Sequence, residues 1–304
     1  MLPKVSASQI IIRPPVEGSS GSILIPVTGG CSWNKCKFCG TYKGMYGIAQ
    51  DYEIRSLKDI KRDIDNYSGN SAYGFPVFLA GGNPTSAPTD FLVEVIKYIR
   101  LKIKSVPRIS CYAKALDILR KSDEELKELA KAGLDIVYMG LESGSSKILR
   151  IMRKGTNAES MIKAGKKVLN AGIKLSLYVI LGLGGKKYSE EHIKGTAKVI
   201  SEINPTIFRF RTLNIVPFSE LWDEWKNGEF ELLSPVQNLK EEKEIIENLG
   251  INVTSQVFND HMSNYCALES LNIKEDRERF LKTLESYIDD PRIQNLPRKN
   301  LIRM

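Results

Sequence analysis

Long apolar runs are missing from this 304-residue sequence: none reaches the about eighteen residues that a membrane-spanning helix needs, so we expect no such span. The first twenty residues include Pro3, Pro14 and Pro15 and lack the apolar core of a secretory signal, which indicates a cytoplasmic protein. Cysteine is also scarce. Five cysteines, three of them on one loop, suit a reducing compartment better than a disulfide framework.

A strong excess of either charge is absent as well. Lys and Arg number 44 and Asp and Glu 36, which gives a formal charge of +8. The charges are spread over amphipathic segments, no RNA-binding motif accompanies them, and the local basic bias is confined to residues 291–304. Nucleic acid is therefore left open as a partner without being favoured. Hydrophobic residues at 42% and charged residues at 26% are typical of a soluble globular protein.

Three of the five cysteines, Cys31, Cys36 and Cys39, fall within nine residues in the pattern Cys-x4-Cys-x2-Cys. Three thiolates on one loop can bind one soft metal centre but cannot close a tetrahedral zinc site alone. A four-iron cluster takes four thiolates, so three would leave one iron with open coordination positions. This spacing therefore favours an iron–sulfur site with a free position for chemistry.

Two other interpretations of the thiols stay open. A structural zinc site would need a distant fourth ligand, for which the candidates are Cys111, Cys266, His192 and His261, and no second Cys-x2-Cys pair is present. Unliganded thiols, or one disulfide with a spare cysteine, would be exposed to oxidation.

The order of elements predicts an α/β fold with parallel strands. Strands are expected at 22–27, 77–80, 108–113, 136–140, 175–181 and 206–216, and the segments between them have helical periodicity. Helix signals include an N-cap at Ser56, a capping box from Ser122 to Glu125 and a terminating Gly133. Six repeats of about 31 residues indicate a (β/α) barrel, whose sites lie at the carboxyl ends of the strands.

The remaining chain breaks this alternation. Helices are expected at 221–227, 234–249 and 276–287 and a strand at 251–257. We therefore expect a lead-in over 1–21, a six-unit barrel over 22–217, and a C-terminal α/β extension over 218–304 that covers the barrel.

The cysteine loop, with the aromatic Phe38 before its last cysteine, resembles that of the radical S-adenosylmethionine (radical SAM) superfamily, although one residue is added to the commonest Cys-x3-Cys-x2-Cys spacing. The resemblance covers about 22–217 and implies a partial (β/α)6 barrel with a [4Fe-4S] cluster on Cys31, Cys36 and Cys39. It further implies SAM on the open iron and an electron from a low-potential donor of the flavodoxin or ferredoxin type. A 5′-deoxyadenosyl radical would then abstract hydrogen from a substrate, small or macromolecular, in an oxygen-free setting.

The resemblance also suggests which residues bind SAM. Gly81, Gly82 and Asn83 match a Gly-Gly-Glu segment that holds the methionine amino group, with Asn in place of Glu; the alternative is a tight turn before Pro84. Glu142 would accept the ribose hydroxyls and Ser143 would donate to a carboxylate, unless the segment merely caps the next helix.

Three further cofactor contacts are expected. Arg153 is the candidate partner for the SAM carboxylate; the alternative is that Arg150, Arg153 and Lys154 are exposed helix charges. Gly182 follows the fifth strand where the family packs backbone against adenine, although a bare glycine turn explains it equally well. Ser110 would line the SAM or substrate cavity.

Substrate-side candidates come from two stretches. Ser110, Tyr112 and Lys114 alternate along the third strand and share a face, so Cys111 would point toward the helices and be inert. The polar loop around His261, Tyr265 and Cys266 resembles segments of functionally unassigned family members. A surface loop with a satisfied histidine is the alternative.

Strand six places Arg209 and Arg211 on one face, which indicates an anionic substrate or the SAM carboxylate unless they lie at an open edge in solvent. The sequence indicates neither an auxiliary cluster nor a cobalamin-binding domain, which disfavours methylthiolation and cobalamin-dependent methylation. Hydrogen abstraction with rearrangement, dehydrogenation, cross-linking or fragmentation is left, and the subclass is undetermined. The rival functions are a zinc-stapled nucleic-acid-binding module and a metal-independent barrel enzyme acting on phosphate esters.

Overall fold

The computed structural model of the chain describes residues 21–45, 49–68 and 74–297. Within these residues eight strands form one mostly parallel sheet in the order β1-β4-β5-β6-β7-β8-β9-β10. Its strands are β1 (Ile23–Pro26), β4 (Val77–Ala80), β5 (Ile109–Ala113), β6 (Ile136–Glu142), β7 (Lys174–Leu181), β8 (Ile207–Thr212), β9 (Gln256–Phe258) and β10 (Glu269–Ser270). Only the β9–β10 pair is antiparallel among the registers described for this sheet. The parallel α/β architecture expected from the alternation is confirmed.

The chain divides into two compact units, which are not the three segments expected from the sequence. The first comprises residues 1–34, 39–139 and 167–174, and the second 35–38, 140–166 and 175–304. The expected lead-in lies almost wholly outside the described residues. The division into 1–21, 22–217 and 218–304 stays a prediction.

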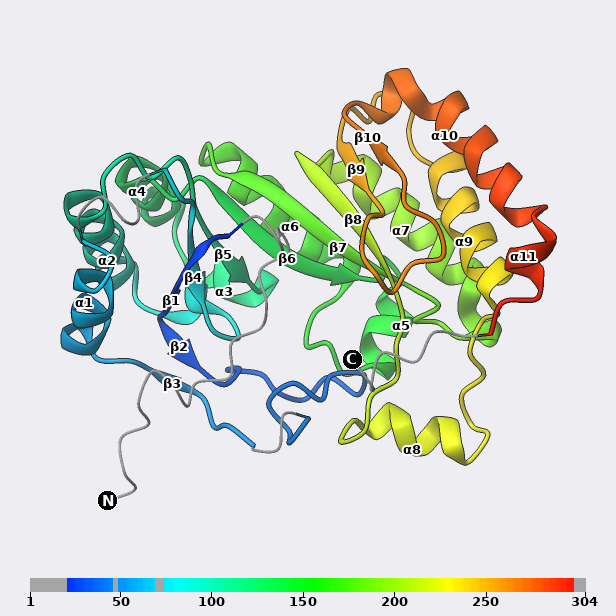
Figure 1. Cartoon of the computed structure of the whole chain (residues 1–304), viewed down its shortest axis with the longest axis horizontal. Coiled ribbons are helices and arrows are strands. Elements are labelled where there is room, and N and C mark those ends of the chain that lie inside the picture. The colour runs from blue at the N-terminus through cyan, green and yellow to red at the C-terminus, as the bar shows by residue number, and fades with distance from the viewer. Residues whose placement is uncertain (1–20, 46–48, 69–73, 298–304) are drawn as a thin grey trace. The chain divides into compact units, whose positions relative to one another are not determined.

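The first unit packs helices against β1, β4 and β5. Its helices are α1 (Leu57–Asp65), α2 (Thr89–Lys102), α3 (Ala115–Arg120) and α4 (Asp123–Ala132), and α2 lies between α1 and α4 (Figure 1). The N-cap at Ser56, the capping box at Ser122 and the left-handed Gly133, with φ of 109°, are all present as expected. All four residues of β4 are buried, so this strand lies at the centre of the unit's core. A separate antiparallel pair joins β2 (Thr28–Gly29) to β3 (Glu53–Ile54).

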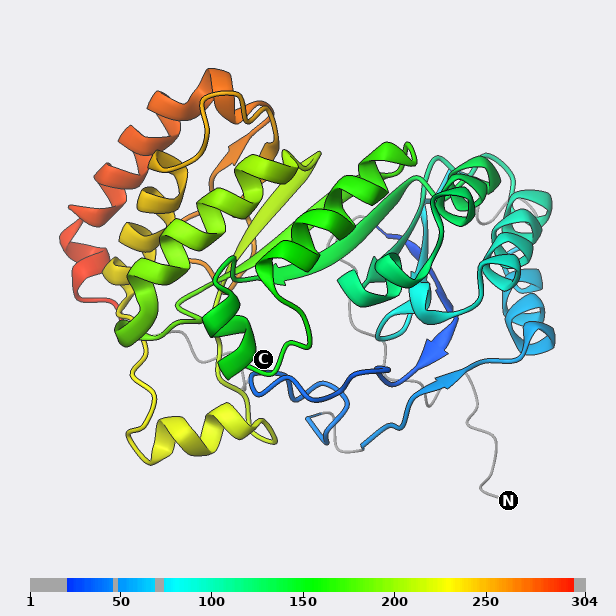
Figure 2. The same cartoon turned by 180° about the vertical axis from the view of Figure 1, so that it is seen from behind.

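The second unit packs helices against β7, β8 and β9. Its helices are α5 (Ser146–Ile151), α7 (Ser189–Ile203), α8 (Glu220–Lys226), α9 (Pro235–Glu247), α10 (Ile273–Ile288) and α11 (Pro291–Gln294), while α6 (Ala158–Asn170) contributes to both units. Figure 2 shows α7, α9 and α10 in a row, with α9 in the middle. No helix among the described residues combines the length and the apolar character that crossing a bilayer requires.

Several elements differ from expectation, and α3 and β10 are among those that had not been expected. The sixth strand ends at Thr212 and not at 216. The strand expected at 251–257 begins only at Gln256, because Thr254 donates its backbone N–H to the side chain of Asn204 at 3.0 Å and so joins a loop. The helix considered after the Glu142 segment is the six-residue α5, which is capped by Ser145 and ends at Ile151, before Arg153.

Candidate active site

The start of the cysteine loop rests on the turn after β4. Gly82 donates its N–H to the Gly30 carbonyl at 3.0 Å, and a Cβ on Gly82 would lie 2.2 Å from that oxygen and 2.8 Å from the Cα of Cys31. Gly81 has φ of 121°, and its Cβ would lie 2.3 Å from the Thr28 carbonyl oxygen. Both glycines are therefore required by the close approach of the protein's own loop, whatever they contribute to a ligand.

Asn83 ties this part of the loop to α3. Its side chain is fully buried, and its Oδ1 accepts the backbone N–H of Ser32 at 3.1 Å. Its Nδ2 donates to Ser32 Oγ at 2.8 Å and to the buried Asp117 carboxylate at 2.6 Å. Both amide hydrogens are thus engaged, so the capacity left for SAM is a lone pair on Oδ1. We did not anticipate Asp117 as the partner that orients this amide.

The β5 candidates separate into two kinds. Lys114 is the N-cap residue of α3, and its Nζ donates to Ser32 Oγ at 3.2 Å and lies 5.5 Å from the Trp33 ring centroid. Ser110 and Tyr112 are both buried, and Tyr112 packs edge-on against Phe78 with centroids 4.9 Å apart. Lys114 therefore reaches the cysteine loop, while Ser110 and Tyr112 lie inside the packed first unit.

The middle of the loop, Lys35 to Phe38, belongs to the second unit and is held there by α5 and α8. Lys37 donates its N–H to the Met152 carbonyl at 3.0 Å, and its own carbonyl accepts the N–H of Leu221 at 3.0 Å. Its Nζ pairs with Glu224 of α8. Phe38 packs against the buried cluster that contains Met152 and Leu221. Nothing in the sequence of α8 signalled this contact, because it joins segments about 185 residues apart.

Glu142 and Lys154 form a sheltered ion pair in the second unit. Glu142 has φ of 60°, and its Oε1 lies 2.6 Å from Lys154 Nζ, with side chains 12% and 15% exposed. The expectation that Lys154 is an exposed helix charge is therefore wrong. Lys154 Nζ also lies 6.0 Å from the Phe38 ring centroid. The Arg153 guanidinium instead pairs with Glu220 at 2.7 Å on the surface, where such a pair contributes little.

Ser143 and Gly182 belong to a buried polar network. Ser143 Oγ lies 2.8 Å from Nδ1 of His192, and both side chains are fully buried. Burial lowers the pKa of His192 to about 3, so the imidazole is neutral. Glu241 of α9 accepts the N–H of Gly182 at 2.5 Å and the hydroxyl of Ser189, and burial raises its pKa to about 7.

Glu241 was not anticipated, and His192 was considered only as a distant zinc ligand. One signal was available, because helical spacing from the apolar Leu239 and Ile245 places the neighbouring Glu242 on the buried face of α9. Carboxylates on such a face need polar partners.

The loop between β9 and β10 is fastened to β8 by one asparagine. Asn264 Nδ2 donates to the Phe210 carbonyl at 2.9 Å, and its Oδ1 accepts the N–H of Thr212 at 2.8 Å. His261 is only partly buried, and its Nδ1 accepts the N–H of Ser263 at 3.1 Å, so the ring proton of the neutral form lies on Nε2.

Tyr265 and Cys266 point into the interior, at 9% and 7% exposed. Cys266 Sγ lies 3.1 Å from Nδ2 of Asn259, which also donates to both carboxylate oxygens of Glu242. Burial raises the pKa of Glu242 to about 8, so it is protonated at neutral pH. Cys266 is thus part of a packed network.

The five cysteines differ in their surroundings. Cys31, Cys36 and Cys39 are partly exposed, whereas Cys111 and Cys266 are buried. Burial raises the pKa of Cys111 to about 12, which agrees with the inert thiol expected from strand parity. Among the described residues no three His, Cys, Asp or Glu side chains are gathered as around a metal ion. The donor set nevertheless fits an iron–sulfur cluster, since three partly exposed thiols share one braced loop.

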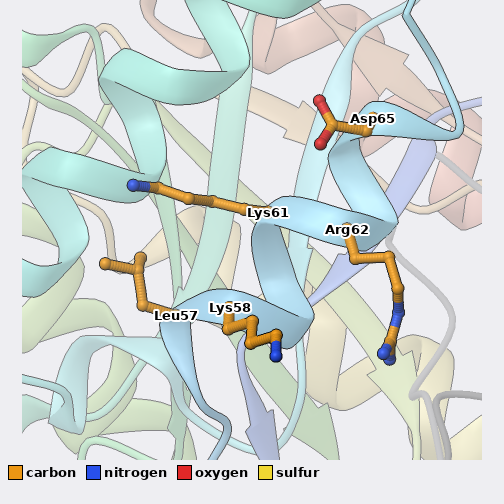
Figure 3. Close-up of a pocket in the computed structure, with 5 residues that line it drawn as sticks. All are labelled: Leu57, Lys58, Lys61, Arg62 and Asp65. Atoms are coloured by element: carbon orange, nitrogen blue, oxygen red, sulfur yellow. The ribbon is translucent and has the colours of Figure 1, made fainter.

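A pocket on α1 is a separate feature. Leu57, Lys58, Lys61, Arg62 and Asp65 line it (Figure 3). It contains none of the candidate residues, and its charged side chains are those of a solvated helix face.

Comparisons with known proteins agree with this site. The family model described as the Radical SAM superfamily matches residues 25–200. An uncharacterized protein of Methanocaldococcus jannaschii is 26% identical over 94% of this chain and 85% of its own length. A tRNA uridine(34) acetyltransferase of Methanocaldococcus infernus is 25% identical over 73% of this chain, which spans 48% of that protein.

Among solved structures, methylornithine synthase superposes with a TM-score of 0.52 at 16% identity, over 92% of this chain and 83% of the other. At that identity the likeness concerns the fold, and it supports the partial barrel expected from the sequence.

Proposed function

Because the chain belongs to the radical SAM superfamily, we propose that Cys31, Cys36 and Cys39 hold its [4Fe-4S] cluster. The enzyme uses SAM and an unidentified substrate. When bound, the cluster supplies a low-potential electron and an open iron position, at which SAM is cleaved so that hydrogen can be abstracted from the substrate. The observation that carries this assignment is a loop with three accessible thiols, braced at Ser32 by Asn83 and at Lys37 by α5 and α8.

The residues around the loop have definable tasks in this proposal. Asn83 and Lys114 hold Ser32 and so fix the backbone next to Cys31. Gly81 and Gly82 let the loop lie against β4 and leave little bulk beside SAM. Glu142 keeps one carboxylate oxygen beyond its bond to Lys154, with which it can accept a ribose hydroxyl. Lys154 adds positive charge near Phe38, the residue before Cys39.

The partner that delivers the electron is, in this proposal, a low-potential donor of the flavodoxin or ferredoxin type, as the family resemblance implies. We place the enzyme in the cytoplasm, where three accessible thiols stay reduced. His261, Tyr265 and Cys266 remain substrate-side candidates, of which His261 alone is more than marginally exposed.

The test is anaerobic purification followed by iron and sulfide analysis, electron paramagnetic resonance of the reduced protein, and detection of 5′-deoxyadenosine from SAM with dithionite. Replacing Cys31, Cys36 and Cys39 by serine should abolish all three signals. Cys111→Ala, which removes a buried thiol, is the matched control and should keep them. Stoichiometric zinc in place of iron, or iron retained by the triple variant, would refute the proposal.

A further inference from the structure

β8 presents two arginines on one face of the second unit. Phe208, Phe210 and Thr212 are buried, whereas Arg209 and Arg211, with the opposite parity, are partly exposed. In the parallel register Arg209 lies between Tyr178 of β7 and Phe258 of β9. Both guanidiniums therefore stand on the sheet face opposite the buried phenylalanines.

The charge of Arg209 is compensated within the unit. Its Nη1 lies 3.1 Å from Asp260 Oδ1, and its guanidinium carbon lies 4.3 Å from the Phe258 ring centroid. Asp260 belongs to the loop that Asn264 fastens to β8, so the ion pair is built into the fold. Arg209 is a positioned structural cation.

Arg211 differs from Arg209 in one respect. Its guanidinium stacks over the Tyr178 ring at 4.9 Å, and none of the ion pairs within 21–45, 49–68 and 74–297 includes it. A guanidinium is a planar fork of N–H groups that matches the two oxygens of a carboxylate or phosphate, and an aromatic ring beside it leaves that fork available. Keeping the partly buried Arg211 guanidinium without an anion costs free energy, which a bound anion would offset.

We propose that this face is the substrate's anion subsite, with Arg211 as the bidentate anchor and Tyr178 as the platform that orients it. The substrate therefore carries an oxyanion, either a carboxylate or a phosphate. That the bound anion is part of a substrate rests on the proposed function. Binding of an anion at Arg211 does not depend on SAM chemistry.

The experiment is arginine modification of the full chain by phenylglyoxal, followed by peptide mass spectrometry. Inorganic phosphate, benzoate and chloride are compared at equal ionic strength, and SAM is a fourth condition. Arg211 should be protected about tenfold by phosphate or by benzoate relative to chloride, as for a charge-assisted pair. Phosphate protection assigns a phosphate ester and benzoate protection a carboxylate. Arg120, which is 78% exposed, is the internal control and should react equally in all conditions.

Variants separate anchoring from packing. Arg211→Gln should weaken binding of the protecting anion about tenfold to a hundredfold, and Arg211→Lys should restore only part of it, because lysine keeps the charge without the planar fork. Both variants should melt within a few degrees of the parent protein. Protection by SAM alone would assign Arg211 to the cofactor and overturn the inference, as would equal reactivity in all four conditions. Iron content of the same preparation reports separately on the proposed function.

Discussion

The contact between Asn83 and Asp117 offers a sharp test of how the cysteine loop is held. Asp117 is 3% exposed and accepts from Asn83 Nδ2 at 2.6 Å, and this bond fixes which way the amide faces Ser32. A hydrogen bond to a charged group is worth about 1.5–3 kcal/mol. Asp117→Ala should therefore lower the free energy of unfolding by about 2 kcal/mol, and Asp117→Asn, which keeps an acceptor, by about half as much.

Two assays on the apoprotein measure the effect. Urea denaturation gives the free energy of unfolding, and the rate of iodoacetamide labelling at Cys31, read by peptide mass spectrometry, reports on the loop. With the amide free to rotate, Asp117→Ala should speed labelling of Cys31 several-fold, while buried Cys111 stays slow. Labelling is done at urea concentrations far below the denaturation midpoint. Its rate therefore reports on motion of the loop and not on global unfolding.

The control variant is Arg120→Ala, since Arg120 approaches Asp117 only at 4.0 Å and is 78% exposed. It should change neither measurement appreciably. The reversed pair Asn83→Asp with Asp117→Asn keeps a donor and an acceptor in contact and should recover most of the loss. Stability within about 0.5 kcal/mol of the parent protein for Asp117→Ala, together with unchanged labelling, would show that the bond does not hold the loop.

Three other predictions follow from contacts of the same region and of the buried network. The pKa of Glu242 is raised in the fold from 4.5 to about 8, so native stability should fall as pH rises through that window, and Glu242→Gln should flatten the fall seen in urea midpoints. Leu221→Ala opens the packing under the middle of the loop; it should cost about 2–4 kcal/mol in urea unfolding and speed alkylation of Cys36, and an unchanged rate would contradict the role of α8. Gly82→Ala places a methyl group 2.2 Å from a carbonyl oxygen and should abolish iron incorporation, measured by iron analysis, whereas Gly250→Ala, with its nearest contact at 3.4 Å, should retain it.

Much of the fold could be predicted from local signals in the sequence. The buried strand at 77–80, the capping box at Ser122 and the stop at Gly133 depend on residues within one turn of each other, so their chemistry is legible in the sequence. Cys111, which was expected to be inert, is buried, but all five residues of β5 are buried, so strand parity itself stays a prediction. The cysteine spacing indicated the family.

The missing parts depend on distant pairs. Asp117 meets Asn83 across 34 positions, and Leu221 meets Lys37 across 184, and no local pattern announces either contact. The glycines after β4 were noticed for the right physical reason, close backbone approach, but the approaching group in the structure is the cysteine loop itself. The strand expected at 251–257 failed because Asn204 captures the backbone of Thr254.

The contacts of α8 with Lys37 and Phe38 give the C-terminal part of the chain a role in holding the cysteine loop. A protein shortened at residue 217 would keep every cysteine of the loop and every strand through β8, yet the Lys37 carbonyl and the Phe38 ring would lose the partners that Leu221 supplies. Such a fragment would retain the three cysteines and the contact of Asn83 with Ser32, but it would lack the contacts that α8 makes with the middle of the loop. The segment that contains α8 therefore supports the cysteine loop directly, and the cysteine motif alone does not define the proposed cluster site.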